Sequence, residues 1–107
     1  MKKNKSGIIT KRINGKKMIV TLNGRIDTST APELEKQIMQ SLDGVEKLVF
    51  DFKTVEQVSS AGLRMLSATQ KQMKKQGEMI IKNTSDEIRE YFEETGFTDI
   101  LTLEDVY

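Results

Sequence analysis

Two adjacent hydroxyl side chains, Ser59 and Ser60, are the residues of this sequence best placed to do chemistry. They lie in the segment Val58–Leu66 (Val-Ser-Ser-Ala-Gly-Leu-Arg-Met-Leu), after an apolar run typical of a buried strand and at the predicted start of a helix. A helix start carries unpaired backbone N–H groups and partial positive charge, and both favour a bound anion. A serine here could therefore carry a phosphate group, which makes the segment a candidate regulatory site.

The same position also suits a serine with a purely structural role. Serine is among the preferred residues for capping the N-terminus of a helix, and a cap contributes about 1 kcal/mol of stability. Spacing alone favours such capping over a regulated hydroxyl. Gly62 has a similar structural interpretation, as a small residue that permits close packing.

Residue types that are missing exclude most conventional catalytic sites. The chain has no cysteine, so it has no disulfide, thiolate nucleophile or cysteine-containing zinc site. It also has no histidine, the commonest general base near neutral pH and the commonest metal ligand. A Ser–His–Asp triad is therefore impossible. We expect a protein that is not an enzyme and that needs no metal or other cofactor.

Length and composition indicate one globular domain spanning residues 1–107, with 36% hydrophobic and 31% charged residues. No apolar run approaches the roughly 20 residues that a membrane-spanning helix needs. The basic segment Met1–Gly7 is not followed by an apolar stretch of signal-peptide length. We therefore expect a cytoplasmic protein with no membrane attachment.

The net charge of +1 hides an uneven distribution along the chain. Met1–Lys17 carries seven basic residues and no acidic one, whereas Glu78–Tyr107 carries two basic and nine acidic residues. The two ends could form oppositely charged surfaces that steer partners, or they could lie close together and neutralise each other. The basic end has no interleaved aromatic residues, so we expect no direct binding to nucleic acid.

The N-terminal half begins with a predicted β-hairpin. Ile8–Ile13 and Lys17–Leu22 are β-type runs around Asn14-Gly15-Lys16, and Asn-Gly is a strong turn signal because both residues accept a positive φ. A polar loop is expected at Asn23–Asp27. The first strand would lie at a sheet edge, where charged residues such as Lys11 discourage pairing with a second chain, so a monomer is expected.

Helices and strands alternate after the hairpin. Thr30 is expected to cap the first helix with Glu33 closing a capping box, and Pro32 fits its first turn. The buried face of this helix should consist of Leu34, Ile38 and Leu42, and Gly44 should end it. The chain then continues with a predicted strand at Lys47–Phe52, a connection at Thr54–Val58 and a helix at about Ser60–Gln76. The last predicted elements are a strand at Met79–Lys82, a helix starting at Thr84–Glu87 with Ile88 and Phe92 inward, and a strand or short helix at Ile100–Leu103.

This order, β-β-α-β-α-β-α, predicts an α/β domain with a mixed sheet of four to five strands and three to four helices. Ligand and partner sites of open α/β sheets gather beyond the carboxyl ends of the strands. Ser59 and Ser60 should lie at that edge, and the loop that holds Asp27 could reach it too. One surface could then combine these side chains with the N–H groups of a helix start.

Three motifs together resemble the STAS domain, in particular the free-standing anti-sigma factor antagonists of bacteria. Leu22–Asp27 (Leu-Asn-Gly-Arg-Ile-Asp) is similar to the family's Leu-x-Gly-x-hydrophobic-Asp after the second strand. Leu48–Phe52 is similar to its central strand, and Ser59–Leu66 to its phosphoserine segment. Gly77–Met79 and Thr95–Phe97 fall where the family has a strand entry and a helix end. The resemblance covers nearly the whole chain.

The resemblance implies a switch controlled by phosphorylation. A partner that is both anti-sigma factor and serine kinase would bind the unphosphorylated chain, which frees the sigma factor, and phosphorylation of one serine would release it. A serine phosphatase would reset the cycle. Alignment on Gly62 and Leu63 places the phosphate acceptor at Ser60, with Ser59 as the alternative. The implied partner-binding residues are Asn23, Gly24, Asp27, Ser59, Ser60, Gly62 and Arg64.

The chain departs from the family's frequent Asp-Ser-Ser/Thr-Gly pattern at two positions. Ser59 stands where that pattern has Asp, and Ala61 stands where it has a second hydroxyl. Two other functions therefore stay open. One is a STAS scaffold or small-ligand module that works in a signalling complex without phosphorylation, and the other is a plain α/β interaction domain with a capping serine.

Overall fold

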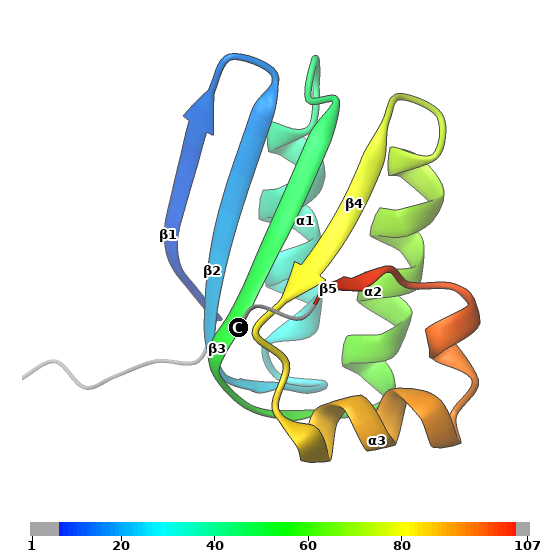
Figure 1. Cartoon of the computed structure of the whole chain (residues 1–107). Coiled ribbons are helices and arrows are strands. Elements are labelled where there is room, and N and C mark those ends of the chain that lie inside the picture. Colours follow the sequence, from blue (N-terminus) through cyan, green and yellow to red (C-terminus); the bar gives the residue numbers. More distant parts are fainter. Residues whose placement is uncertain (1–6, 105–107) are drawn as a thin grey trace, which may run out of the picture.

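A mixed five-stranded sheet forms the centre of the computed structural model, which describes the backbone of residues 7–104 and the side chains of residues 7 and 13–104 (Figure 1). The strands are adjacent in the order β1-β2-β3-β4-β5. β1 and β2 pair antiparallel, and all later neighbours are parallel. Their bounds are β1 (Gly7–Asn14), β2 (Lys17–Ile26), β3 (Lys47–Val58), β4 (Glu78–Lys82) and β5 (Leu103–Glu104).

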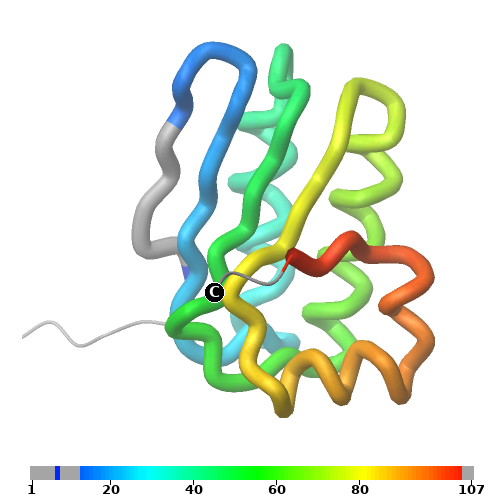
Figure 2. Tube along the Cα trace, in the orientation of Figure 1, coloured from blue at the N-terminus to red at the C-terminus, as the bar shows by residue number. Residues whose placement is uncertain are grey.

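The helices are α1 (Ala31–Ser41), α2 (Ser60–Met73), α3 (Asp86–Glu94) and the short 3₁₀ helix η1 (Phe97–Asp99). Helices α1 and α2 lie side by side on one face of the sheet, and α3 runs across the end where β3 and β4 finish (Figures 1 and 2). The predicted α/β architecture with an initial hairpin is confirmed. The predicted last element at Ile100–Leu103 lies mostly between η1 and β5, with only Leu103 in a strand.

The core lies between the sheet and helices α1 and α2. Alternate residues of β2, namely Met18, Val20 and Leu22, are buried, as the two-residue period of a strand requires. The predicted stripe of Leu34, Ile38 and Leu42 is confirmed, since each is at most 3% exposed. Burying such side chains contributes about 1.5–3 kcal/mol each and is the main force that holds the helices on the sheet.

Aromatic packing attaches α3 to the rest of the molecule. Phe92 of α3 is fully buried, and its ring centroid lies 6.4 Å from that of Phe52 in β3. Ile88, one turn earlier, is 4% exposed, so the predicted inward face of this helix is confirmed. Ser85 caps α3 by accepting a hydrogen bond from the Ile88 backbone N–H at 3.2 Å. The contact between Phe92 and Phe52 holds α3 against β3.

Strands β2 and β3 are longer than predicted. The predictions of a loop at Asn23–Asp27 and a connection at Thr54–Val58 are wrong for all but Asp27, because Asn23–Ile26 and Thr54–Val58 pair with each other as the last parts of β2 and β3. Two register shifts interrupt this pairing, and the Thr54 hydroxyl donates to the Leu22 carbonyl at 2.9 Å. Shifts of this kind break the strict alternation of buried and exposed residues on which sequence prediction of a strand depends.

Two further local predictions are wrong. Asn14 was expected in the hairpin turn with a positive φ, but it ends β1 and only Gly15 (φ 65°) takes that conformation. Thr30 stands at the N-cap of α1 without donating or accepting a side-chain cap bond, so the capping box with Glu33 does not form. Pro32 occupies the first turn as expected. The N-terminal Lys11 and its predicted protection of the sheet edge lie outside the described side chains.

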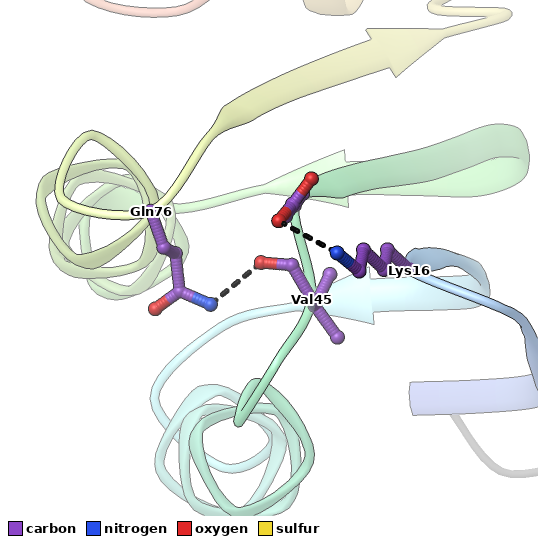
Figure 3. Close-up of polar contacts among 4 residues, drawn as sticks. Lys16, Val45 and Gln76 are labelled. Carbon is purple, nitrogen blue, oxygen red and sulfur yellow. Dashed lines mark hydrogen bonds and ion pairs between the residues drawn. The ribbon is translucent and has the colours of Figure 1, made fainter.

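Polar contacts join the connecting segments at the other end of the sheet (Figure 3). The Gln76 amide donates to the backbone carbonyls of Leu42 and Val45, both at 2.6 Å. Lys16 forms an exposed ion pair with Glu46 at 3.4 Å, an interaction worth at most about 1 kcal/mol. The backbone of this end is thus held firmly, while the opposite end carries the candidate site.

Candidate functional site

The two serines at the start of α2 have different positions and different bonds. Ser59 is the N-cap residue: it is half-buried, and its hydroxyl accepts a hydrogen bond from the Ala61 backbone N–H at 3.2 Å. Its own N–H donates to the Ile26 carbonyl at 2.9 Å. Ser60 is the first residue of the helix and is exposed. The sequence left open whether a serine here caps the helix or offers an accessible hydroxyl. In the structure, Ser59 is the cap and Ser60 has the accessible hydroxyl.

An open cleft of about 590 Å³ lies beside Ser60 at the carboxyl ends of β2 and β3. Ser59 and Ser60 line one part of it, and Arg25 comes from β2. Glu56 at the end of β3 and Glu87 in the first turn of α3 bring two carboxylates, and the remaining lining residues are Gln57, Val58, Ile88 and Tyr91. The cleft is open to solvent, partly apolar and charged, which fits contact with a side chain of a partner protein better than enclosure of a substrate.

Gly62 holds the start of α2 against β2. A methyl group added at Gly62 would stand 2.6 Å from the Ile26 carbonyl oxygen and 2.8 Å from Val58 Cγ1. Real Cβ atoms do not come so close to a backbone oxygen, so only glycine fits here without movement. Gly62 is buried, and its role in the site is to bring the first turn of the helix close to the end of the neighbouring strand.

Asp27 organises the turn between β2 and α1. Its carboxylate accepts hydrogen bonds from the Ser29 hydroxyl at 2.8 Å and from the Ser29 backbone N–H at 3.0 Å. The Thr30 hydroxyl accepts from the Asp27 N–H at 2.9 Å and donates to the Arg25 carbonyl at 2.8 Å, which explains why it does not cap α1. The hydrogen bonds from Ser29 favour the ionised carboxylate and lower the pKa of Asp27.

Removing the Ser29 hydroxyl is expected to raise the pKa of Asp27. An NMR titration of the Asp27 side-chain carboxyl should give a midpoint below the ordinary value of 3.8 in the unmodified protein and a higher midpoint in Ser29→Ala. Because the pKa is lowered in the folded state, the associated stability is present above pH 3.8 and is lost as the pH falls through the folded-state pKa. Ser41→Ala in α1 is the matched control and should leave the midpoint unchanged. A midpoint at or above 3.8 in the unmodified protein would contradict the account of this turn.

The other residues singled out in the sequence lie around the cleft rather than in it. Asn23 and Gly24 are inside β2, opposite Thr54 and Val55 of β3. Arg64 is exposed on α2, one helical turn after Ser60. Asp27 directly follows β2 and faces its own turn.

Sequence reasoning missed the polar residues that line the cleft besides the two serines: Arg25, Glu56, Gln57, Glu87 and Tyr91. Only Arg25 had a signal, its position inside the Leu22–Asp27 motif. Within residues 7–104, no three acidic side chains are grouped so that they could hold a metal ion. No helix in that part of the chain is long and apolar enough to cross a membrane.

Comparison with known proteins gives consistent results. The family model of the STAS domain matches residues 8–107. A Bordetella bronchiseptica protein named as an anti-sigma factor antagonist, BtrV, is 33% identical over 85 residues, which is 78% of this chain and 73% of that protein. The anti-sigma-B factor antagonist of Bacillus subtilis is 31% identical over 85 residues, covering 78% of each chain.

Solved structures agree in fold. An anti-sigma factor antagonist from Mycobacterium paratuberculosis superposes with a TM-score of 0.77 at 28% identity, covering 88% of this chain and 81% of that one. The unphosphorylated form of the anti-sigma factor antagonist SpoIIAA superposes with a TM-score of 0.75 over 94% of this chain and 90% of that one; at 14% identity, this match supports the fold alone.

Proposed function

The chain belongs to the STAS domain family, as an anti-sigma factor antagonist, and we propose that Ser60 is the phosphorylation site that controls its binding to an anti-sigma factor kinase. The observation that carries the proposal is the division of roles between the two serines. Ser60 is exposed beside a cleft, whereas the Ser59 hydroxyl is half-buried and occupied as a helix cap. A kinase must reach the hydroxyl that it modifies.

The same division explains the departure from the family's frequent motif. Asp and Ser are about equally good N-cap residues because each has a short side chain with an oxygen that can accept from the first turn. Ser59 makes this cap bond to Ala61, so the acid of the frequent pattern can be replaced without loss of the helix start. The acceptor one residue later keeps its place at the first position of α2.

Phosphorylation would change the charge of the contact surface more than its shape. The kinase would join the Ser60 Oγ to the γ-phosphorus of ATP, the bond to the β–γ bridging oxygen would break, and ADP and the hydroxyl proton would leave. The product carries about −1.5 to −2 charge and three acceptor oxygens. Ser60 is exposed, so the helix accommodates this group in solvent, but a docked partner would have to desolvate it.

The proposed partner surface surrounds the start of α2. Arg64 and the Asp27 turn flank Ser60, while Asn23, Gly24 and Gly62 hold the backbone beneath them. In this proposal the unphosphorylated chain is a regulator without catalysis: it binds the kinase as a monomer in the cytoplasm, and a serine phosphatase restores it by hydrolysing the phosphate. Neither nucleic acid nor a membrane takes part.

Phosphate mapping tests the choice of residue. The purified protein is incubated with ATP and the candidate kinase of its host, and the phosphate is located by mass spectrometry. We expect phosphate on Ser60 in the unmodified protein and in Ser59→Asn, which keeps a good cap, and none in Ser60→Ala. Phosphate on Ser59, or no incorporation by a kinase that binds the chain, would refute the proposal.

A further inference from the structure

Two arginines from different elements flank Ser60. Arg25 is exposed at the end of β2 and lines the same cleft as Ser60. Arg64 is exposed on α2, four residues after Ser60. Side chains four residues apart on a helix are neighbours, with Cβ atoms about 5–6 Å apart. The intervening Leu63 is buried, which confirms that Ser60 and Arg64 share the solvent face of the helix.

The cleft carries more negative than positive charge before any modification. Arg25 is the one basic residue among those that line it in the described part of the chain, and Glu56 and Glu87 bring two carboxylates. Tyr91 of α3 is the other titratable side chain at the cleft. A phosphate on Ser60 would add a dianion to this acidic surface. Arg25 at the cleft and Arg64 beside it are basic side chains of the described residues that could compensate this charge.

We propose that Arg25 and Arg64 together bind the phosphate of phosphorylated Ser60. A guanidinium group presents several N–H donors in a plane, which suits the oxygens of a phosphate group. Arg25 would approach the phosphate from the strand side of the cleft and Arg64 from the helix. This proposal rests on the proposed function, because it requires that Ser60 is the residue that carries the phosphate.

This arrangement gives phosphorylation a second effect on the partner surface. Besides adding negative charge, the phosphate would draw the two arginine side chains toward itself, so the positions of the cationic groups near Ser60 would change. A partner that contacts Arg64 with an acidic group would lose that contact at the same time as it meets the phosphate. The phosphorylated and unphosphorylated surfaces would then differ over an area wider than one residue.

The test measures the second pKa of the phosphate by ³¹P NMR. Phosphoserine is placed at position 60 during translation, by codon-directed incorporation, so that no kinase is needed. The titration is compared among four proteins that all carry phosphoserine at position 60: the background protein without further substitution, Arg25→Gln, Arg64→Gln and the double variant. Lys71→Gln is the matched control, because Lys71 is exposed on the same helix, about 16 Å along the helix axis from Ser60. This separation exceeds the electrostatic screening distance of about 8 Å at physiological salt.

We expect a phosphate pKa below the usual value of about 6 in the background protein, because the arginines favour the dianion. Each single variant should raise it by about 0.2–0.7, the range of an exposed ion pair, and the double variant should raise it further. Lys71→Gln should leave it unchanged. A double variant whose phosphate pKa moves no further than that of Lys71→Gln would overturn the proposal.

A second readout does not depend on substitution. The ¹⁵N–¹H signals of the two guanidinium groups in the background protein should shift with the pH midpoint of the phosphate. Guanidinium chemical shifts that do not change at the phosphate midpoint would also overturn the proposal. Neither result would bear on whether a kinase modifies Ser60, so failure here is distinguishable from failure of the phosphate mapping.

Discussion

Ser60→Asp is expected to weaken binding of the anti-sigma factor kinase about tenfold to hundredfold, whereas Ser60→Ala binds like the unmodified protein. The aspartate places a permanent negative charge at the first position of α2, where a docked partner must desolvate it. A penalty of roughly 1.4–2.8 kcal/mol corresponds to this loss of affinity. The alanine removes only an exposed hydroxyl. Isothermal titration calorimetry with the purified kinase measures both affinities.

Ser59→Asp is the matched control for this experiment. It introduces the same charge one residue earlier, at the N-cap, where Asp accepts the bond that Ser59 now accepts from the Ala61 N–H. We expect it to keep more affinity than Ser60→Asp. Circular dichroism should show all three variants folded, since an acidic residue near a helix N-terminus is favourable by 0.3–1 kcal/mol. Equal binding by Ser60→Asp and Ser60→Ala would contradict the charge mechanism.

Gly77→Ala is expected to cost about 3 kcal/mol or more of the free energy of unfolding. Gly77 precedes β4, where the chain passes close to the backbone before β3. An added methyl group would overlap the Glu46 carbonyl oxygen. This oxygen is fixed by the hydrogen bond that it accepts from the Glu78 N–H at 3.0 Å, and Gln76 is bonded to Val45 beside it (Figure 3). Any shift that relieves the overlap must disturb these backbone hydrogen bonds, so the cost should lie at or above the usual range for overpacking.

Gly96→Ala is the control for this substitution. Gly96 has open space around it and a φ of 79°, so an alanine there costs only the roughly 1–2 kcal/mol of the left-handed conformation. Urea denaturation gives both values. We expect a clearly larger loss for Gly77→Ala, together with a decrease of the melting temperature by roughly 10 °C or more. A loss no greater than that of Gly96→Ala would show that the two backbones are not held as described.

The scaffold of this protein could be predicted from local patterns. The apolar spacing of Leu34 and Ile38 gave the buried face of α1, and that of Ile88 and Phe92 gave the buried face of α3, because helix periodicity is a property of neighbouring residues. The Asn-Gly pair located the hairpin. These elements in this order admit few sheet topologies, and the observed one, with a single antiparallel pair followed by parallel strands, is among them.

Details that depend on contacts between distant segments could not be predicted. The last parts of β2 and β3 pair with each other in a shifted register. Buried and exposed residues therefore do not alternate regularly at Thr54–Val58. The predicted helix start at Ser60 is confirmed, but the contacts that hold Ser59 as the cap involve a distant segment, since the Ser59 N–H donates to the Ile26 carbonyl of β2. The cleft combines Arg25, Glu56 and Glu87 from three elements, and no motif links them.

In the proposed switch, a phosphate on Ser60 releases the anti-sigma factor kinase. The most direct measurement compares the affinity of the kinase for the unmodified chain and for the chain with phosphoserine incorporated at position 60. We expect phosphorylation to raise the dissociation constant at least a hundredfold, because a dianion replaces an exposed hydroxyl at the contact surface. Equal dissociation constants for the two forms would contradict it.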